Sequence, residues 1–145
     1  MKNDTADLLF QLYENLGFGK HMLKALILRT RDGTFRNALA EQYAHYHTLM
    51  EKACVQLGAQ LGNEGRGGRK RFFDACARAS LRMHLKIDST SSHMAEMVLQ
   101  GCTMNLIDAA RGLRVFAGAN DAAKALAQKL ISMEQKNIDR MTEYL

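Results

Sequence analysis

Hydrophobic residues recur at spacings of three and four along most of the chain, which is the pattern of helices with one apolar face. The pattern predicts four long helices over residues 4–31, 34–61, 89–117 and 120–144, and a shorter helix over 69–87. A glycine-rich stretch over 62–68 predicts a flexible loop after the second helix. The chain contains no proline, which would cost about 3 kcal/mol inside a helix. We therefore expect one all-α domain over residues 1–145.

The connections between these segments suggest how the helices are arranged. The turn at Asp32 and Gly33 predicts an antiparallel hairpin of the first two helices. Gly118 and the cap-prone Asn120 predict a second short connection before the last helix. The shorter helix over 69–87 can travel about 30 Å, nearly the length of the bundle. The second and third long helices therefore need not be antiparallel neighbours, and the hydroxyl-rich run over 89–92 is expected to break or kink the chain between them.

Charge and composition narrow the class of protein only slightly. The net charge of +5 permits an acidic partner, although such a surplus is modest for a domain of 145 residues. The three cysteines lie far apart in the sequence, which favours buried thiols in a reducing compartment. Acidic residues interrupt the first apolar run, so it does not resemble a secretory signal, and no stretch is long enough to span a membrane. We expect a cytoplasmic protein.

Three stretches carry a resemblance to a known architecture: the early segment DLLFQLYENLGFG, the glycine-rich break, and the segment DSTSSHMAEMVLQGCTMNLID. Together with two hairpins joined by a long crossover, they resemble the small bacterial helical bundles of the ferritin-like superfamily. The resemblance implies a four-helix bundle of ferritin-like type with an additional crossover helix between helices two and three. Well-studied ferritin-like proteins hold two metal ions with two glutamates and two Glu-x-x-His pairs.

This chain has no Glu-x-x-His pair, and the nearest substitutes are Glu41 with His45 and His93 with Glu96 in reversed order. A divergent site for iron, manganese or zinc would draw on Glu14, Glu41, His45, His93, Glu96 and Glu134. Glu41 and His45 share a helix face and are the pair that suits a single zinc ion, but a solvated histidine beside a glutamate fits the same spacing. This metal-binding interpretation is an alternative, and we expect no cofactor.

The inward stripes of the helices favour amides over carboxylates in the bundle centre. The stripe of the second helix passes through Gln42, and that of the last helix passes through Met133 and Asn137, with Glu134 beside it. Asn105 is a third inward candidate. Amides can pair with one another without the cost of burying a charge. The sequence therefore predicts a polar core layer of Gln42, Asn105 and Asn137 that sets the helix register.

Two further features are compatible with binding. Ser92, His93 and Glu96 lie at the entrance of the third long helix, where hydroxyl groups suit either a small anion or a capped, kinked helix end. A basic face on the shorter helix comprises Arg69, Arg71, Arg78, Arg82 and Lys86. This face is charged like a phosphate-binding surface, but no nucleic-acid motif accompanies it, so a solvated helix face is expected.

No combination of acid, base and nucleophile emerges from the sequence, so we assign no catalytic residue. The main prediction is a non-enzymatic structural or interaction protein that forms a homodimer, the commonest assembly of a small bundle. A metal-carboxylate bundle is the first alternative. Binding of an anion or nucleic acid through the basic face is the second.

Overall fold

The computed structural model describes residues 3–61 and 90–145, and these two ranges contain four α-helices and no strand. The helices are α1 (Asp4–Arg29), α2 (Gly33–Leu61), α4 (Ser91–Val115) and α5 (Asp121–Thr142). The all-α prediction is therefore confirmed, and each helix begins and ends within two residues of its predicted bounds. The loop expected over 62–68 and the helix expected over 69–87 lie outside the described residues.

Each helix begins at a side chain that satisfies a free backbone N–H of the first turn. The capping oxygens belong to Asn3, Asp32, Thr90 and Asn120, and they accept hydrogen bonds of 2.9–3.3 Å. Such a cap is worth about 1 kcal/mol. At the start of α4, where a break or kink was expected, Thr90 is extended and its side chain accepts from the backbone N–H of His93. The hydroxyl-rich run therefore begins a helix at this point.

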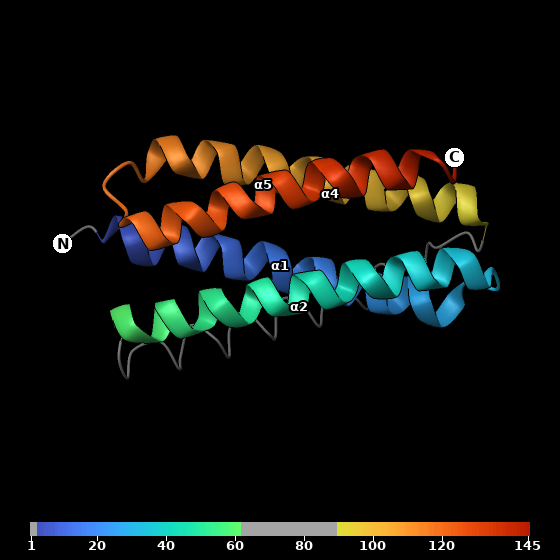
Figure 1. Ribbon diagram of the computed structural model, residues 1–145, viewed down its shortest axis with the longest axis horizontal. Helices are drawn as coiled ribbons and strands as arrows, with labels where there is room; N and C mark the ends of the chain where they lie inside the picture. Colours follow the sequence, from blue (N-terminus) through green and yellow to red (C-terminus); the bar gives the residue numbers. More distant parts are fainter. Residues whose placement is uncertain (1–2, 62–89) are drawn as a thin grey trace.

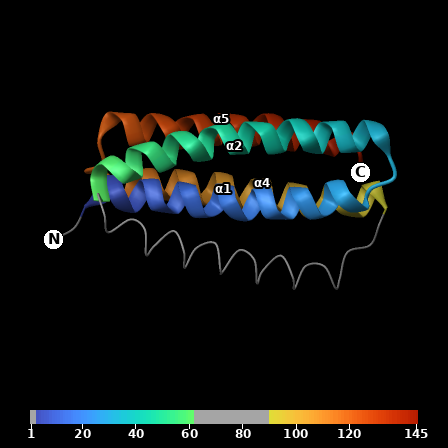
Figure 2. The ribbon, with the colours of Figure 1, turned by 90° about the horizontal axis from the view of Figure 1, so that it is seen from below.

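The helices form two antiparallel hairpins, α1 with α2 and α4 with α5. In Figure 1, α2 and α5 lie in front of α1 and α4, and Figure 2 shows these two layers from the side. α1 also packs against α4, and α2 against α5. α2 ends and α4 begins at opposite ends of the bundle, so these two helices point in the same direction from diagonal corners (Figures 1 and 2).

The bundle centre is filled by the apolar stripes that the sequence predicts. On α1 the inward residues are Leu9, Leu12, Leu16, Leu23 and Leu26, all at most 1% exposed. Fully burying one such side chain contributes about 1.5–3 kcal/mol. On α2 the stripe through Leu39, Gln42 and Tyr46 is buried as well. The part of the chain that the structure describes contains no helix long and apolar enough to cross a membrane.

The start of α1 is tied to the connection between α4 and α5. Asp4 Oδ2 accepts a hydrogen bond of 2.9 Å from the backbone N–H of Gly118, and Thr5 Oγ1 accepts one of 2.9 Å from that of Asn120. A side chain at Gly118 would meet the Asp4 carboxylate, because an added Cβ would lie 2.8 Å from Oδ2. These contacts fix one hairpin against the other at this end of the bundle.

Candidate functional site

A carboxyl group lies in the centre of the bundle. Glu134 of α5 is 0% exposed. The Tyr46 hydroxyl donates to this carboxylate and lies 2.7 Å from both of its oxygens. The amide of Asn105 donates to Oε2 at 2.8 Å, and the amide of Asn137 donates to Oε1 at 2.7 Å. Three helices therefore converge on one carboxylate, and every donor in these contacts is a neutral group.

Two further residues extend this network towards α2 and α4. Gln42 Nε2 donates to the Tyr46 hydroxyl at 3.0 Å and to Cys102 Sγ at 3.4 Å. Cys102 Sγ lies 3.7 Å from the same hydroxyl. We call Gln42, Tyr46, Cys102, Asn105, Glu134 and Asn137 the Glu134 cluster. Because the cluster bonds α2, α4 and α5 to one another, sliding any of these helices would leave buried polar groups unpaired.

The helical repeat explains why these side chains meet. α2, α4 and α5 each contribute a pair at a spacing that shares one face: Gln42 with Tyr46, Cys102 with Asn105, and Glu134 with Asn137. α1 contributes no polar side chain to the cluster, but it leaves room for the Tyr46 ring at Gly19. A Cβ added at Gly19 would lie only 2.7 Å from Cε2 of the Tyr46 ring, so a glycine at this position lets the ring reach the centre. The geometry of the cluster thus depends on all four described helices.

Burial dominates the protonation of the cluster. It raises the pKa of Glu134, although the hydrogen bonds from Tyr46, Asn137 and Asn105 act in the opposite direction. Burial and the nearby Glu134 carboxylate raise the pKa of Tyr46 well above its ordinary value. The same two causes raise the pKa of Cys102 to about 12. The phenol and the thiol therefore stay protonated at neutral pH, and Cys102 is not an activated nucleophile.

The structure places the three predicted amides in the core, since Gln42, Asn105 and Asn137 are 3%, 9% and 8% exposed. The expected position of Glu134 beside the inward stripe is wrong. Glu134 is fully buried, whereas Met133, which was expected on that stripe, is half-buried. The physical reason is that Tyr46, Asn105 and Asn137 supply the donors that a buried carboxylate requires. The polar layer is therefore centred on an acid.

The residues considered for a metal site are not brought together. Glu41, His45 and Glu96 are exposed, and Glu14 and His93 are half-buried. Burial raises the pKa of Glu14. Within residues 3–61 and 90–145, no group of three or more His, Cys, Asp or Glu side chains could hold a metal ion. Arg69, Arg71, Arg78, Arg82 and Lys86 lie outside the described residues.

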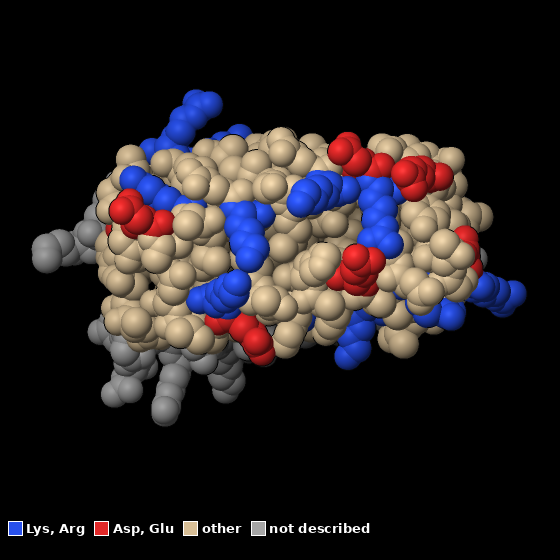
Figure 3. All heavy atoms as spheres, in the orientation of Figure 1, with Lys and Arg blue, Asp and Glu red and all other residues tan. Residues whose placement is uncertain are grey.

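A groove of about 530 Å³ opens on the surface between α2 and α5. It is lined by Glu41, Gln42, His45, Lys129, Ser132, Met133, Lys136, Asn137 and Arg140. Figure 3 looks onto this side of the bundle and shows basic side chains gathered over the seam between the two helices. Gln42 and Asn137 belong both to this α2–α5 groove and to the Glu134 cluster. The buried cluster therefore lies directly beneath an accessible surface.

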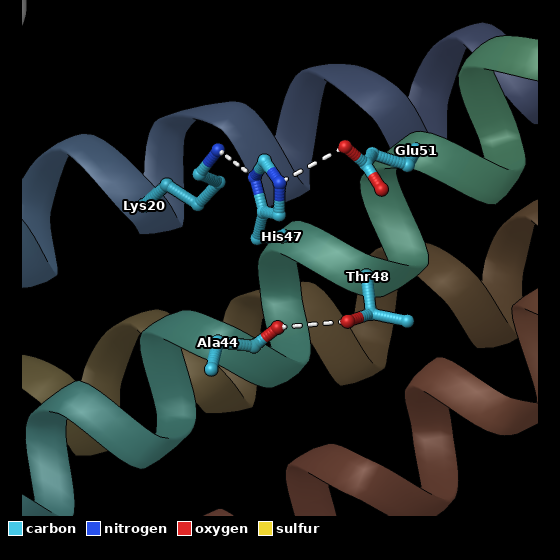
Figure 4. Close-up of polar contacts among 5 residues, drawn as sticks. All are labelled: Lys20, Ala44, His47, Thr48 and Glu51. Atoms are coloured by element: carbon cyan, nitrogen blue, oxygen red, sulfur yellow. Dashed lines mark hydrogen bonds and ion pairs between the residues drawn. The ribbon is translucent and has the colours of Figure 1, made fainter.

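A second polar arrangement connects α1 to α2 on another side. Lys20 Nζ lies 2.8 Å from Nδ1 of His47, and Nε2 of the same ring lies 3.0 Å from a Glu51 oxygen (Figure 4). The side chains of His47 and Glu51 are 50% and 68% exposed. Lys20 also lies 5.2 Å from the centroid of the Tyr43 ring. These are solvated surface contacts of the kind that salt screens.

No family model, curated protein or solved structure matches the chain.

Proposed function

We propose that this chain is a ferritin-like helical bundle that acts as a non-enzymatic structural or interaction module and associates with a second copy of itself. The helix directions support the ferritin-like part of the proposal. Two antiparallel hairpins pack together so that α2 and α4 point the same way from diagonal corners (Figures 1 and 2). A long crossover between hairpins, as in ferritin-like bundles, has this arrangement.

The hydrogen bonding of Glu134 is the observation that carries the non-enzymatic part. In ferritin-like metal sites, a glutamate and the histidine three residues later both bind the ion. Here Asn137 stands three residues after Glu134, and its amide donates to that carboxylate at 2.7 Å. With Tyr46 and Asn105 donating as well, the carboxylate lone pairs point at neutral groups of the protein's own core. This arrangement supports a role in setting helix register.

The outer face of α4 supports self-association. Met104, Ile107 and Val115 are 56%, 38% and 58% exposed, and their spacing places them along one side of the helix. Methionine side chains adapt their shape readily to a partner surface. A second copy of this face would bury these side chains, and twofold dimers are the commonest assembly of small soluble proteins.

Two measurements test the proposal on the full chain. Light scattering should give the mass of a dimer for the unmodified protein and of a monomer for Met104→Lys. Leu28→Lys is the matched control, because it changes an apolar residue of α1 that is 72% exposed, and it should remain dimeric. A monomeric unmodified protein would contradict self-association.

Metal analysis of the purified protein tests the non-enzymatic part separately. We expect less than one iron, manganese or zinc ion per chain. Stoichiometric metal that is lost in Glu134→Gln would instead support a metal-carboxylate bundle.

A further inference from the structure

The α2–α5 groove has a surplus of positive charge. Among the described residues, its lining contains the cations Lys129, Lys136 and Arg140 and the single acid Glu41. Glu41 Oε2 lies 2.7 Å from Nη1 of Arg140, and this contact lowers the pKa of Glu41. Neither Lys129 nor Lys136 forms an ion pair with another described residue. Two positive charges therefore remain in the groove after Glu41 and Arg140 have paired.

A neighbouring residue adds to this surplus. The neighbouring Lys52 side chain on α2 lowers the pKa of Lys129 on α5. Two ammonium groups close to each other repel. An anion bound between them would convert that repulsion into attraction on both sides.

The floor of the groove offers a hydrogen-bond acceptor. Gln42 is 3% exposed, and its Nε2 is committed to Tyr46 and Cys102. Its Oε1 is shielded from solvent and accepts no hydrogen bond from another described residue. Asn137 Nδ2 is likewise committed, to Glu134. The carbonyl oxygen of Asn137 is therefore the amide atom left for the groove, and a hydroxyl group on a ligand would complement it.

We infer that the α2–α5 groove binds a small organic phosphate that carries a free hydroxyl group. The phosphate lies against Lys129 and Lys136, and the hydroxyl group points towards Asn137. A phosphate monoester carries a charge of about −1.5 to −2 at neutral pH, which matches the surplus left after Glu41 pairs with Arg140. The groove volume of about 530 Å³ suits a ligand of this size.

Titrations followed by nitrogen-15 NMR of the full chain test the inference with three probes: glycerol 3-phosphate, inorganic phosphate and glycerol. Glycerol 3-phosphate should shift the backbone signals of Lys129 and Lys136 and the side-chain amide signals of Gln42 and Asn137. Inorganic phosphate should bind about tenfold more weakly, because it lacks the group that reaches the floor. Glycerol alone should cause no shift, because it lacks the charge.

The double variant Lys129→Gln and Lys136→Gln identifies the binding residues. It should weaken binding of glycerol 3-phosphate by at least about tenfold. Lys124→Gln is the matched control, since it removes the same charge from α5 outside the groove lining, and it should bind as the unmodified chain does.

Absence of binding at about 10 mM glycerol 3-phosphate overturns the inference. Equal affinity for inorganic phosphate and glycerol 3-phosphate, or equal losses in the double variant and Lys124→Gln, also overturns it. The self-association test alters Met104, which lies on α4 and outside this groove, so the two proposals fail separately.

Discussion

The Glu134 cluster and the α2–α5 groove share Gln42 and Asn137 but treat charge in opposite ways. In the cluster, one fully buried carboxylate accepts hydrogen bonds from Tyr46, Asn105 and Asn137 and pairs with no cation of residues 3–61 and 90–145. In the groove, several cations face solvent, and only Arg140 is paired with an acid of the described chain. The carboxylate of the first region is satisfied from within the protein, and the lysines of the second are not.

The difference follows from what water can supply. A buried charge without donors costs several kcal/mol, so the core provides a donor to each carboxylate oxygen. An exposed ammonium group is hydrated and can remain unpaired at little cost. The same two helices can therefore present a closed hydrogen-bonded face to the core and an open charged face to a ligand. Changes in the cluster should alter stability, whereas changes in the groove should alter binding.

The largest effect should come from removing the centre of the cluster. Glu134→Ala leaves the donors of Tyr46, Asn105 and Asn137 without their acceptor and opens a cavity. We expect the free energy of unfolding in urea to fall by about 3–5 kcal/mol. Glu96→Ala makes the same chemical change at an exposed site of α4 and should change stability by less than about 0.5 kcal/mol. Similar losses in both variants would show that the burial of Glu134 does not matter.

A smaller effect should come from the space on α1 that admits Tyr46. In Gly19→Ala the new Cβ would lie 2.7 Å from the ring, so the ring or the helix must move. We expect a loss of about 1–3 kcal/mol from the free energy of unfolding. Gly33→Ala is the matched control, because no neighbouring atom in the described part of the chain lies within 4 Å of its added Cβ. If both variants were equally stable, the close approach of Gly19 to Tyr46 would not constrain the cluster.

The helices and the three amides follow from local periodicity, whereas the position of Glu134 does not. Met133 and Glu134 are adjacent, and either one continues a stripe of helical spacing from Leu130 to Asn137. Hydrophobicity alone favours Met133. Glu134 is the inward residue because donors arrive from Tyr46 on α2 and Asn105 on α4, distant in the sequence. Such contacts depend on how the hairpins pack, which a helical period does not encode.

The α2–α5 groove is not predicted from the sequence for a related reason, although the basic side chains that line it on α5 can be recognised there. Lys129 and Lys136 are seven residues apart, with Arg140 four residues later, so they line one face of a helix. This stripe predicts a basic surface on the last helix. The sequence does not indicate that Gln42 and His45 of the second helix lie opposite it. The basic surface predicted from the sequence comprises residues over 69–86, which lie outside the described residues.

The pH dependence of stability provides a third test of the contrast. Because burial raises the pKa of Glu134, the folded state holds its proton to higher pH than the unfolded state does. The resulting stabilisation is complete below the ordinary glutamate pKa of about 4.3 and is lost as pH rises through the folded-state pKa. Relative to Glu134→Gln, the unmodified chain should lose stability with increasing pH, by at most about 1.4 kcal/mol per pH unit. A constant difference between the two proteins in urea unfolding from pH 4 to pH 8 would contradict this assignment.

The smallest effect on stability should come from the groove's own ion pair. The Arg140 guanidinium lowers the pKa of Glu41. The pair therefore stabilises the fold above the ordinary glutamate pKa, and this contribution is lost on acidification. The pH dependence is opposite in sign to that of Glu134. Both side chains are about half exposed, and water and salt weaken their attraction. Glu41→Gln should therefore unfold at nearly the same urea concentration as the unmodified chain, and high salt should remove the remaining difference.

The same variant frees Arg140 and should tighten glycerol 3-phosphate binding by a few-fold, measured by the NMR titration. Weaker binding in Glu41→Gln would mean that the acid itself contacts the ligand.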